Sequence, residues 1–382
     1  MRALSLCVPL AFGLSMFVQE ARAEDIKIVS WNAHASLPEH IEERTKNFKD
    51  FAQKLKPDVV VLVEVTGLAE ALAIARNLGW AQYHGIISNF SVASTEAFQG
   101  LEVAVISKKP VDKAVEFDAF PEGEGGSHRI FTEQGVIGAP IAEQKLSVVG
   151  MQGVFPLERF DRGTLRVDLG GDTKLSIFPV HLKSNRNSPC GKIETTIRNL
   201  EDLGLEVPPQ LFAMNKNGFD QATEDHRDNA RQRERVIAAV EKLAEQALAE
   251  GRVPVIAGDF NTGFEPGKAG NSFADCTLQN FSCESGPFPA LACRDGDGYD
   301  DTLAILENGL VGNVRWAVLS KDLPRTYQGD EKPQYADRAI DHIAVPLTLL
   351  SRFTLAERPG TDKGDRFGSD HYPITTTYHS VP

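Results

Sequence analysis

The sequence predicts an α/β protein in which mixed β-sheets are covered by helices. Strand-like and helix-like segments alternate near the N-terminus, and strand-like segments then follow one another, which favours mixed rather than purely parallel sheets. The chain has 382 residues, 42% of them hydrophobic and 24% charged, so it can bury a large core. No repeat, low-complexity linker or break in composition divides it, and we expect a single domain over residues 24–382.

The first segments establish this alternation. Residues 26–32 alternate apolar and polar side chains, as a half-buried strand does. Residues 39–54 carry apolar side chains at helical spacing, and Pro57 ends the helix. Residues 59–65 are apolar on both faces and predict a strand in the covered centre of a sheet. A helix rich in alanine and leucine is expected at residues 68–78.

The later elements are mostly strands around one long helix. Helical periodicity covers residues 229–248, and the apolar run that Gly258 ends predicts a buried strand. Polar insertions are expected near 185–225 and 263–300, because glycine, proline or cysteine interrupts both. Further strands are expected at residues 101–106, 111–117, 146–151, 165–169, 175–181, 339–345 and 372–378.

Residues 1–23 are typical of a cleaved export signal. Arg2 gives a basic start, residues 4–18 are apolar, and Ala21 and Ala23 fit the small-residue cleavage pattern. The apolar run is too short for a stable membrane span, and no second run is long enough to cross a bilayer. We therefore expect a periplasmic or secreted protein that does not insert stably into a membrane.

The net charge argues against one class of nucleic-acid binder. The formal charge is −13, whereas proteins that hold nucleic acid through a broad electrostatic footprint are usually basic. An acidic protein can still hydrolyse phosphate esters when a bound metal ion supplies local positive charge. No protein partner is predicted.

The cysteines predict disulfides. An even number of cysteines in an oxidising compartment suggests two disulfides, with three possible pairings. Unpaired thiols are the alternative, and no Cys-x-x-Cys pair supports a zinc site. The cysteines that remain after export are Cys190, Cys276, Cys283 and Cys293.

An acidic loop at residues 295–301 superficially resembles a calcium-binding loop. It lacks the glycine that an EF-hand has at the sixth position, and Leu306 replaces the glutamate of the twelfth. A solvated acidic turn is the favoured interpretation, and a structural Ca²⁺ is the alternative.

Polar side chains gather at the ends of the predicted strands, where α/β proteins usually hold ligands. Asp259 and Asn261 follow a buried strand and, two residues apart on an extended backbone, project from the same face. Alone, this segment is typical of an Asx turn. It is joined by other strand-end residues: Asn32, Glu64, His181, Asp341 with His342, and Asp370 with His371.

Some of these residues suit a divalent metal ion. Glu64 and Asp370 are hard oxygen ligands of the kind that Mg²⁺ or Mn²⁺ prefers. Asn32 can add a carbonyl oxygen. The sequence therefore predicts a Mg²⁺ or Mn²⁺ site.

The strand-end residues that are not predicted to bind metal suit the in-line attack of water on a phosphate ester. Asp259 and His371 can orient and deprotonate a water, with Asp341 fixing the tautomer of the imidazole. His181 can protonate the leaving oxygen or stabilise charge on the phosphorane. Asn261 can donate to a phosphate oxygen.

Short motifs containing these residues occur in a fixed order: Ser30-Trp31-Asn32, Val63-Glu64, His181-Leu182-Lys183-Ser184, Gly258-Asp259-Phe260-Asn261, Ile340-Asp341-His342-Ile343 and Gly368-Ser369-Asp370-His371-Tyr372-Pro373. This order resembles that of the endonuclease/exonuclease/phosphatase superfamily, from residue 26 to the end of the chain. The resemblance implies a four-layer sandwich of two packed mixed sheets with helices outside and the site at one rim. It leaves open whether one or two metal ions act.

The resemblance also implies a site by position. Glu102 lies where deoxyribonuclease-like members hold a carboxylate that pairs with the first histidine, here His181. His34 stands where abasic-site enzymes have an aspartate, which argues against a role in base excision. The family's catalytic set falls on Asn32, Glu64, His181, Asp259, Asn261, Asp341, Asp370 and His371.

The substrate is less specified. Positive charge near the predicted acid, His181, suits a phosphate-rich ligand, and it comes from Lys183, Arg186, Arg162 and Arg166. The alternative is that each of these side chains is a solvated surface charge. No exposed apolar hairpin suited to a lipid surface is evident. The sequence favours a nuclease or general phosphodiesterase. A phosphomonoesterase, a sphingomyelinase-like lipid phosphodiesterase and a non-catalytic binding protein on the same fold are the alternatives.

Overall fold

A computed structural model describes residues 24–33, 41–90, 102–118, 130–137, 141–145, 163–183, 203–205, 216–262, 302–309, 311–323, 325–327, 339–360 and 362–380. Several predictions lie outside these residues: the export signal, His34, the strand at 146–151, Arg162, Arg186, the four cysteines and the acidic loop at 295–301.

The described strands form two seven-stranded sheets, and the first has the order β14-β1-β2-β4-β3-β6-β7. β1 pairs in parallel with β2 and antiparallel with β14, so the sheet is mixed, as predicted. Its strands are β1 (Asp25–Asn32), β2 (Val59–Val65), β3 (His84–Ile87), β4 (Glu102–Ser107), β6 (Ile130–Thr132), β7 (Gly135–Ile137) and β14 (Ile374–His379).

The second sheet has the order β12-β13-β11-β10-β9-β5-β8. It is also mixed, because β10 and β11 are parallel while β11 and β13 are antiparallel. Its strands are β5 (Val111–Asp118), β8 (Ala142–Lys145), β9 (Thr164–Leu169), β10 (Leu175–His181), β11 (Val253–Asp259), β12 (Trp316–Val318) and β13 (Asp341–Pro346).

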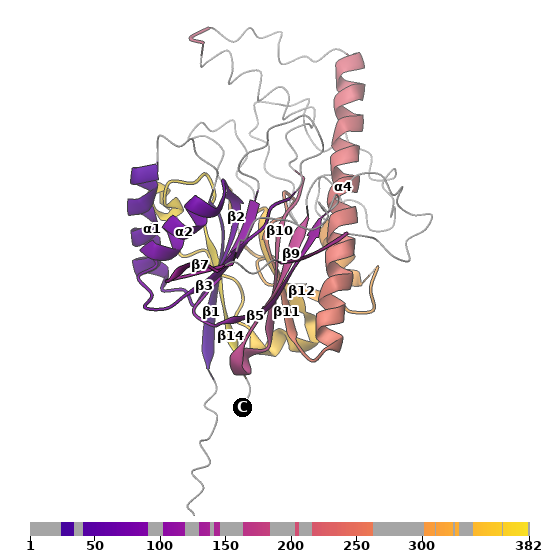
Figure 1. Cartoon of the computed structure of the whole chain (residues 1–382). Coiled ribbons are helices and arrows are strands. Elements are labelled where there is room, and N and C mark those ends of the chain that lie inside the picture. The colour runs from indigo at the N-terminus through magenta and orange to yellow at the C-terminus, as the bar shows by residue number, and fades with distance from the viewer. Residues whose placement is uncertain are drawn as a thin grey trace, which may run out of the picture.

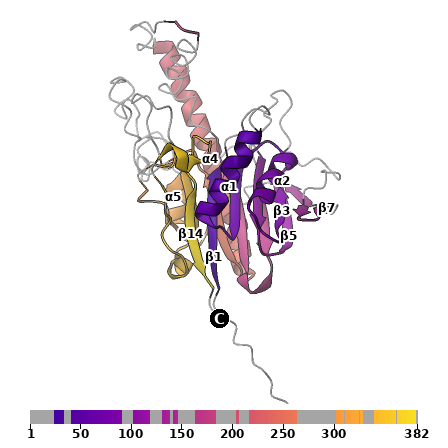
Figure 2. The ribbon, with the colours of Figure 1, turned by 90° about the vertical axis from the view of Figure 1, so that its left-hand side faces the viewer.

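Helices cover the outer faces of both sheets, which gives the expected four layers (Figures 1 and 2). α1 and α2 pack on the first sheet, and α4 and α5 pack on the second. The helices are α1 (Ile41–Leu55), α2 (Leu68–Asn77), α4 (Lys216–Ala249) and α5 (Thr302–Asn308), with short 3-10 turns η2 (Gly171–Thr173), η7 (Leu347–Arg352) and η8 (Lys363–Arg366).

Side-chain alternation explains why β2 is apolar on both faces. Val59, Val61 and Val63 pack between the two sheets. Val60 and Leu62 point the other way, into the cluster beneath α1 and α2. All of them are fully buried, so the central position predicted for this strand is confirmed.

α4 is longer than the sequence pattern predicts. It begins at Lys216 rather than at residue 229, so the end of the insertion expected at 185–225 is helical. The added part has no apolar stripe, and Figure 1 shows that this end of α4 extends beyond the sheets. Periodicity reveals only the part that packs on a sheet. None of the described helices, α4 included, is long and apolar enough to span a membrane.

The strand ends that carry polar residues meet at one rim. β10 and β11 place His181 opposite Asp259, and β11 and β13 place Asp259 opposite Asp341. In the first sheet, β1 ends at Asn32 and β2 ends one residue after Glu64. Register therefore brings the predicted residues to the same edge.

Candidate active site

Asn32 connects the two sheets at this rim. Its Nδ2 lies 3.0 Å from Oε1 of Glu64 in the first sheet and 3.1 Å from Oδ2 of Asp259 in the second. The same nitrogen is 3.3 Å from Nε2 of His371. Asn32 is buried, so the site is formed across the interface between the sheets.

A β-bulge presents Glu64 to the site. The register of β2 on β4 shifts between Val63 and Val65, and Glu64 itself has a φ of 57°. Few residues other than glycine adopt this left-handed conformation, and it is a form of backbone strain found at functional sites. Oε1 of Glu64 lies 3.3 Å from Nε2 of His181, so the bulge aims the carboxylate at the second sheet.

Gly258 lets the ends of β10 and β11 approach. Its φ is 147°, and a Cβ at this position would lie 1.9 Å from the carbonyl oxygen of Val180. Only glycine fits this close approach. Nε2 of His181 consequently lies 3.9 Å from Oδ2 of Asp259.

The turn after β11 orients the Asp259 carboxylate. The backbone N–H of Asn261 donates to Oδ1 of Asp259 at 2.7 Å, and Asn261 has a φ of 53°. Its side-chain Nδ2 donates to the carbonyl oxygen of Leu182 at 2.9 Å. The Asx-turn interpretation is therefore confirmed, and the turn leaves Oδ2 of Asp259 3.1 Å from Nδ2 of Asn32.

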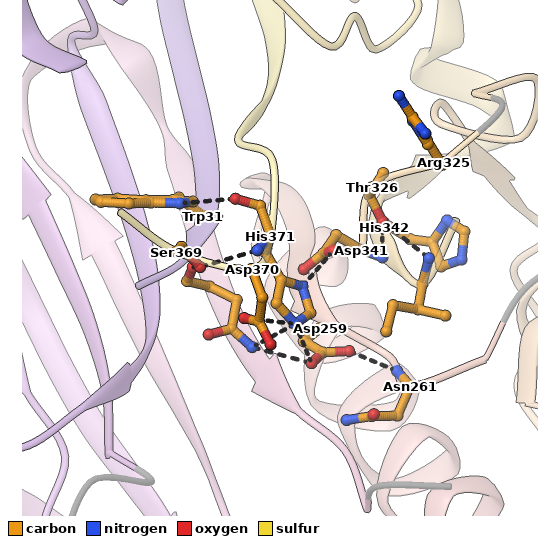
Figure 3. A network of polar contacts seen from close by, with 12 residues as sticks. Trp31, Asp259, Asn261, Arg325, Thr326, Asp341, His342, Ser369, Asp370 and His371 are labelled. Atoms are coloured by element: carbon orange, nitrogen blue, oxygen red, sulfur yellow. Dashed lines mark hydrogen bonds and ion pairs between the residues drawn. The ribbon is translucent and has the colours of Figure 1, made fainter. Parts of the chain in front are cut away.

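His371 lies between carboxylates. Its Nδ1 is 2.8 Å from Oδ2 of Asp341, and both side chains are buried. Its Nε2 is 3.9 Å from Oδ2 of Asp259 and 3.8 Å from Oδ1 of Asp370. Figure 3 shows the imidazole pointing from Asp341 towards Asp259.

The turn before His371 is anchored to the first sheet. The Ser369 hydroxyl donates to the carbonyl oxygen of Asn32 at 2.8 Å and accepts the N–H of His371 at 2.9 Å. Phe367, at a φ of 54°, packs edge-on against the ring of Trp31. The position of His371 is thus fixed relative to β1.

Charge around Asp259 and His371 shifts both pKa values. Burial, with the charges of Asp341 and Glu64, raises the pKa of Asp259 to about 7. Burial alone would lower the pKa of His371, but the charge and hydrogen bond of Asp341, with the charges of Asp259 and Asp370, raise it well above its ordinary value. His371 therefore holds its proton more strongly than an ordinary histidine, and Asp259 is a stronger base than an ordinary aspartate.

His342, next to Asp341 in sequence, lies outside this network. Its Nδ1 is 2.8 Å from the Ser320 hydroxyl and its Nε2 is 2.8 Å from the carbonyl oxygen of Thr262. Burial lowers its pKa to about 4, so the ring is neutral and donates from Nε2 to Thr262. We assign His342 a structural role.

Two groups of potential metal ligands lie at the rim. Among the described residues, one group is Glu64, His181 and Asp259, and the other is Asp259, Asp341 and His371. Within each, the ligand atoms lie within 4.8 Å of one another. Of the predicted metal ligands, Glu64 lies beside Asn32, and Asp370 lies beside His371.

The remaining predicted residues have different outcomes. Glu102 begins β4 opposite Val65, where it accepts hydrogen bonds from the Ser88 hydroxyl and the Phe90 N–H, and its role beside His181 stays a prediction. Lys183 follows β10, and its carbonyl accepts a hydrogen bond from Arg233. Its expected contact with phosphate stays a prediction.

The suggestion that Arg166 contacts substrate is wrong. Arg166 is buried in ion pairs with Asp168 and Glu250. Glu250 precedes β11, whereas Asp259 ends it, so the guanidinium group of Arg166 is directed away from the rim. A buried structural ion pair and an exposed substrate-binding arginine look alike in sequence.

Thr326 belongs to the site, but the sequence does not single it out. Its hydroxyl accepts the backbone N–H groups of Ile340 and Asp341, each at 2.9 Å. No sequence pattern predicts that Thr326 contacts residues 340 and 341, because the two segments are 14 and 15 positions apart and share no helix or strand. Only the tertiary structure reveals this contact.

Comparison with known proteins identifies the family. The sequence profile of the Endonuclease/Exonuclease/phosphatase family matches residues 29–371. None of the curated proteins matches the chain in sequence.

Similar solved structures include an AP endonuclease from Archaeoglobus fulgidus, with 14% identity, a TM-score of 0.47, and coverage of 92% of this chain and 99% of that one. Xenopus laevis APE2, in its catalytic domain, has 16% identity, a TM-score of 0.46 and coverage of 94% of both chains. Truncated Caenorhabditis elegans TDP2 has 16% identity, a TM-score of 0.45, and coverage of 93% of this chain and 97% of that one. Because the family profile spans most of the sequence, the chain belongs to the Endonuclease/Exonuclease/phosphatase family.

Proposed function

We propose that this protein is a divalent-metal-dependent phosphodiesterase that hydrolyses nucleic acid by attack of water on phosphorus. The observation that carries the proposal is the contact of Asn32 with Glu64, Asp259 and His371 across the two sheets. It gathers carboxylates, imidazole and amide in one place, which is the set that metal-assisted phosphoester hydrolysis requires. Members of this family are phosphoester hydrolases.

Glu64, Asp370 and the carbonyl oxygen of Asn32 would hold one or two Mg²⁺ or Mn²⁺ ions. The donor types fit, because these hard ions prefer carboxylate and amide oxygens. Glu64 lies beside Asn32, and among the described residues it also forms a group of close ligand atoms with His181 and Asp259. The Asn32 amide turns its nitrogen towards Glu64 here, and a half-turn of the amide would present its oxygen. A bound ion neutralises charge on the phosphate and polarises a phosphoryl oxygen.

Asp259 is assigned as the group that removes a proton from the attacking water. A carboxyl group whose pKa is raised to about 7 is a stronger base than an ordinary aspartate. The N–H of Asn261 holds Oδ1 of Asp259 in place. The water would be held at Oδ2, the oxygen that faces the other site residues.

His371 is assigned as a charged donor to a phosphate oxygen rather than as a second base. Asp341 keeps its Nδ1 engaged and helps to raise its pKa, so Nε2 carries a proton at neutral pH. The sequence-based expectation was that Asp259 and His371 together remove the proton from water. The proposal now gives proton removal to Asp259 alone. His181 would protonate the leaving oxygen, and the Asn261 amide would donate to another phosphate oxygen.

A substrate panel tests the proposal. Plasmid DNA, RNA, bis-p-nitrophenyl phosphate, p-nitrophenyl phosphate and sphingomyelin vesicles would each be incubated with Mg²⁺ or Mn²⁺ and with EDTA. We expect metal-dependent cleavage of the nucleic acids and the diester. His371→Ala removes a charged donor to the phosphate and should cost at least about 100-fold in turnover. His379→Ala, at a half-exposed histidine paired with Asp25, is the matched control and should change little.

Other outcomes of the panel point to other functions. Hydrolysis of the monoester alone would identify a phosphomonoesterase, and hydrolysis of the vesicles alone would identify a lipid phosphodiesterase. No hydrolysis, together with no calorimetric signal for divalent-ion binding, would leave a binding protein and contradict the proposal.

We also propose export, from the signal pattern at residues 1–23. The intact mass of the protein recovered from the periplasm or medium should correspond to a chain that starts at Glu24. Alkylation without reduction should add no mass, because the four remaining cysteines would be paired. A chain that starts at Met1 would contradict export, and alkylation at four thiols would contradict the disulfides.

A further inference from the structure

A short segment outside both sheets, residues 325–327, lies against the chain that carries His371. Tyr327 forms an isolated antiparallel bridge with His371, and their rings lie 5.0 Å apart at the centroids. The carbonyl oxygen of Thr326 accepts the N–H of Tyr372 at 2.7 Å. The segment is therefore tied to the residues that lead into β14 of the first sheet.

The same segment is tied to the second sheet through one side chain. The hydroxyl of Thr326 accepts the N–H groups of Ile340 and Asp341, each at 2.9 Å, and Thr326 is fully buried. Asp341 begins β13. Figure 3 shows Thr326 beside Asp341, on the side away from the carboxylate of Asp259.

We propose that Thr326 is the positioning residue of the Asp341–His371 pair. The 2.8 Å hydrogen bond of that pair joins Asp341 at the start of β13 in the second sheet to His371 in the turn before β14 of the first, so neither sheet alone fixes its length. Thr326 holds one partner through its hydroxyl and the neighbour of the other through its carbonyl. It acts through Asp341 and His371 and does not touch the reacting atoms, so the inference rests on the proposed function.

The chemistry of the position requires a hydroxyl group. A hydroxyl oxygen has two lone pairs and can accept both N–H groups, whereas a valine of the same shape accepts neither. Two buried N–H groups would then lose their partner, and the start of β13 would shift to recover one. Arg358 supports the segment from outside, because its Nη1 donates to the Arg325 carbonyl at 3.0 Å and its guanidinium lies 4.6 Å from the Tyr372 ring.

Amide hydrogen exchange tests the contact without any assay of activity. In the wild-type protein the amides of Ile340 and Asp341 should be strongly protected. Thr326→Ser should keep that protection, and Thr326→Val should lose it at these two amides. Exchange of both amides at open-chain rates in the wild-type protein would overturn the proposal, even if Thr326→Val fails to fold.

Kinetics test whether Thr326 acts through the pair. On bis-p-nitrophenyl phosphate with Mg²⁺, Thr326→Val should lower kcat about 10- to 100-fold, because Thr326 holds the Asp341 that orients His371. KM should change little, because Thr326 does not contact the substrate. Thr326→Ser should restore kcat. In an Asp341→Asn background the same valine substitution should have almost no further effect, because the two changes remove one interaction.

Thr173→Val is the matched control. Thr173 is a buried threonine whose hydroxyl donates to the Gly170 carbonyl at 3.0 Å, and it precedes β10, far along the strand from His181. It should leave kcat unchanged. An equal loss from Thr326→Val with and without Asp341→Asn would overturn the proposal. A wild-type protein that hydrolyses no phosphoester would contradict the proposed function, while the exchange experiment would still decide the role of Thr326.

Discussion

Two buried histidines near this rim differ in charge, because His371 carries a proton at neutral pH and His342 is neutral. His371 contacts the carboxylate of Asp341, and its pKa rises well above the ordinary value. His342 contacts a hydroxyl and a carbonyl group, and burial lowers its pKa to about 4. The residue type alone does not assign a role, because the neighbouring atoms decide which form of the ring is stable.

His342 should make the protein less stable in acid. Its pKa falls from an ordinary 6.5 to about 4 on folding, so between these pH values only the unfolded chain takes up the proton. The stabilisation is complete above pH 6.5 and is lost as pH falls towards 4, by up to about 3 kcal/mol. Urea unfolding of wild-type protein and His342→Gln across this range measures it, and the variant should show the flatter pH dependence. Identical pH slopes for both proteins would refute this assignment.

At the scale of single elements, the end of β2 has a strained backbone that directs the carboxylate of Glu64 into the site. The strand is fully apolar up to the bulge, and Glu64 adopts a φ of 57° there. The left-handed conformation costs a non-glycine residue about 1 kcal/mol or more. We infer that the strained backbone of Glu64 has a functional role, because the bulge directs its carboxylate towards His181.

Substitutions at Glu64 can separate strain from function. Both Glu64→Ala and Glu64→Gly remove the carboxylate and should lower metal-dependent turnover at least about 100-fold. Glu64→Gly should be more stable to urea than Glu64→Ala by about 1 kcal/mol, because glycine adopts the positive φ without strain.

The exposed Lys174 provides the matched comparison for this pair. It has a φ of 50° and lies in the turn before β10, away from the rim. Lys174→Gly and Lys174→Ala should show the same difference in stability with unchanged turnover. Equal stability of the two Glu64 variants would show that the bulge is unstrained.

The elements predicted from sequence are those whose pattern is long enough to be unambiguous. β2 and β11 are continuous apolar runs, and α1 and the packed part of α4 carry a helical stripe. The missed strands, such as β3, β7 and β12, are three or four residues long and contain too few positions to show a period. The bulge at Glu64 also could not be predicted from the sequence of β2, because a register shift depends on the pairing with the partner strand β4.

At the scale of the whole molecule, the site depends on how the two sheets pack. Asn32 and Asp259 are 227 residues apart in sequence, yet they are joined by a hydrogen bond across the layer of apolar side chains that separates the sheets. The order of the motifs predicted which residues gather at the rim, because each motif lies at one end of a strand. It could not predict the distances among them or find Thr326, because these depend on the packing of both sheets.

The most direct test of the account is the turnover of bis-p-nitrophenyl phosphate by wild-type protein and by Asp259→Asn, each with Mg²⁺ and with EDTA. Asp172→Asn, at an exposed carboxyl group in η2, is the matched control. We expect wild-type protein and Asp172→Asn to be equally active with Mg²⁺ and inactive with EDTA, and a folded Asp259→Asn to be slower by at least about 100-fold. Full activity of Asp259→Asn, or wild-type activity that persists in EDTA, would contradict the central claim that Asp259 is the base of a metal-dependent phosphodiesterase.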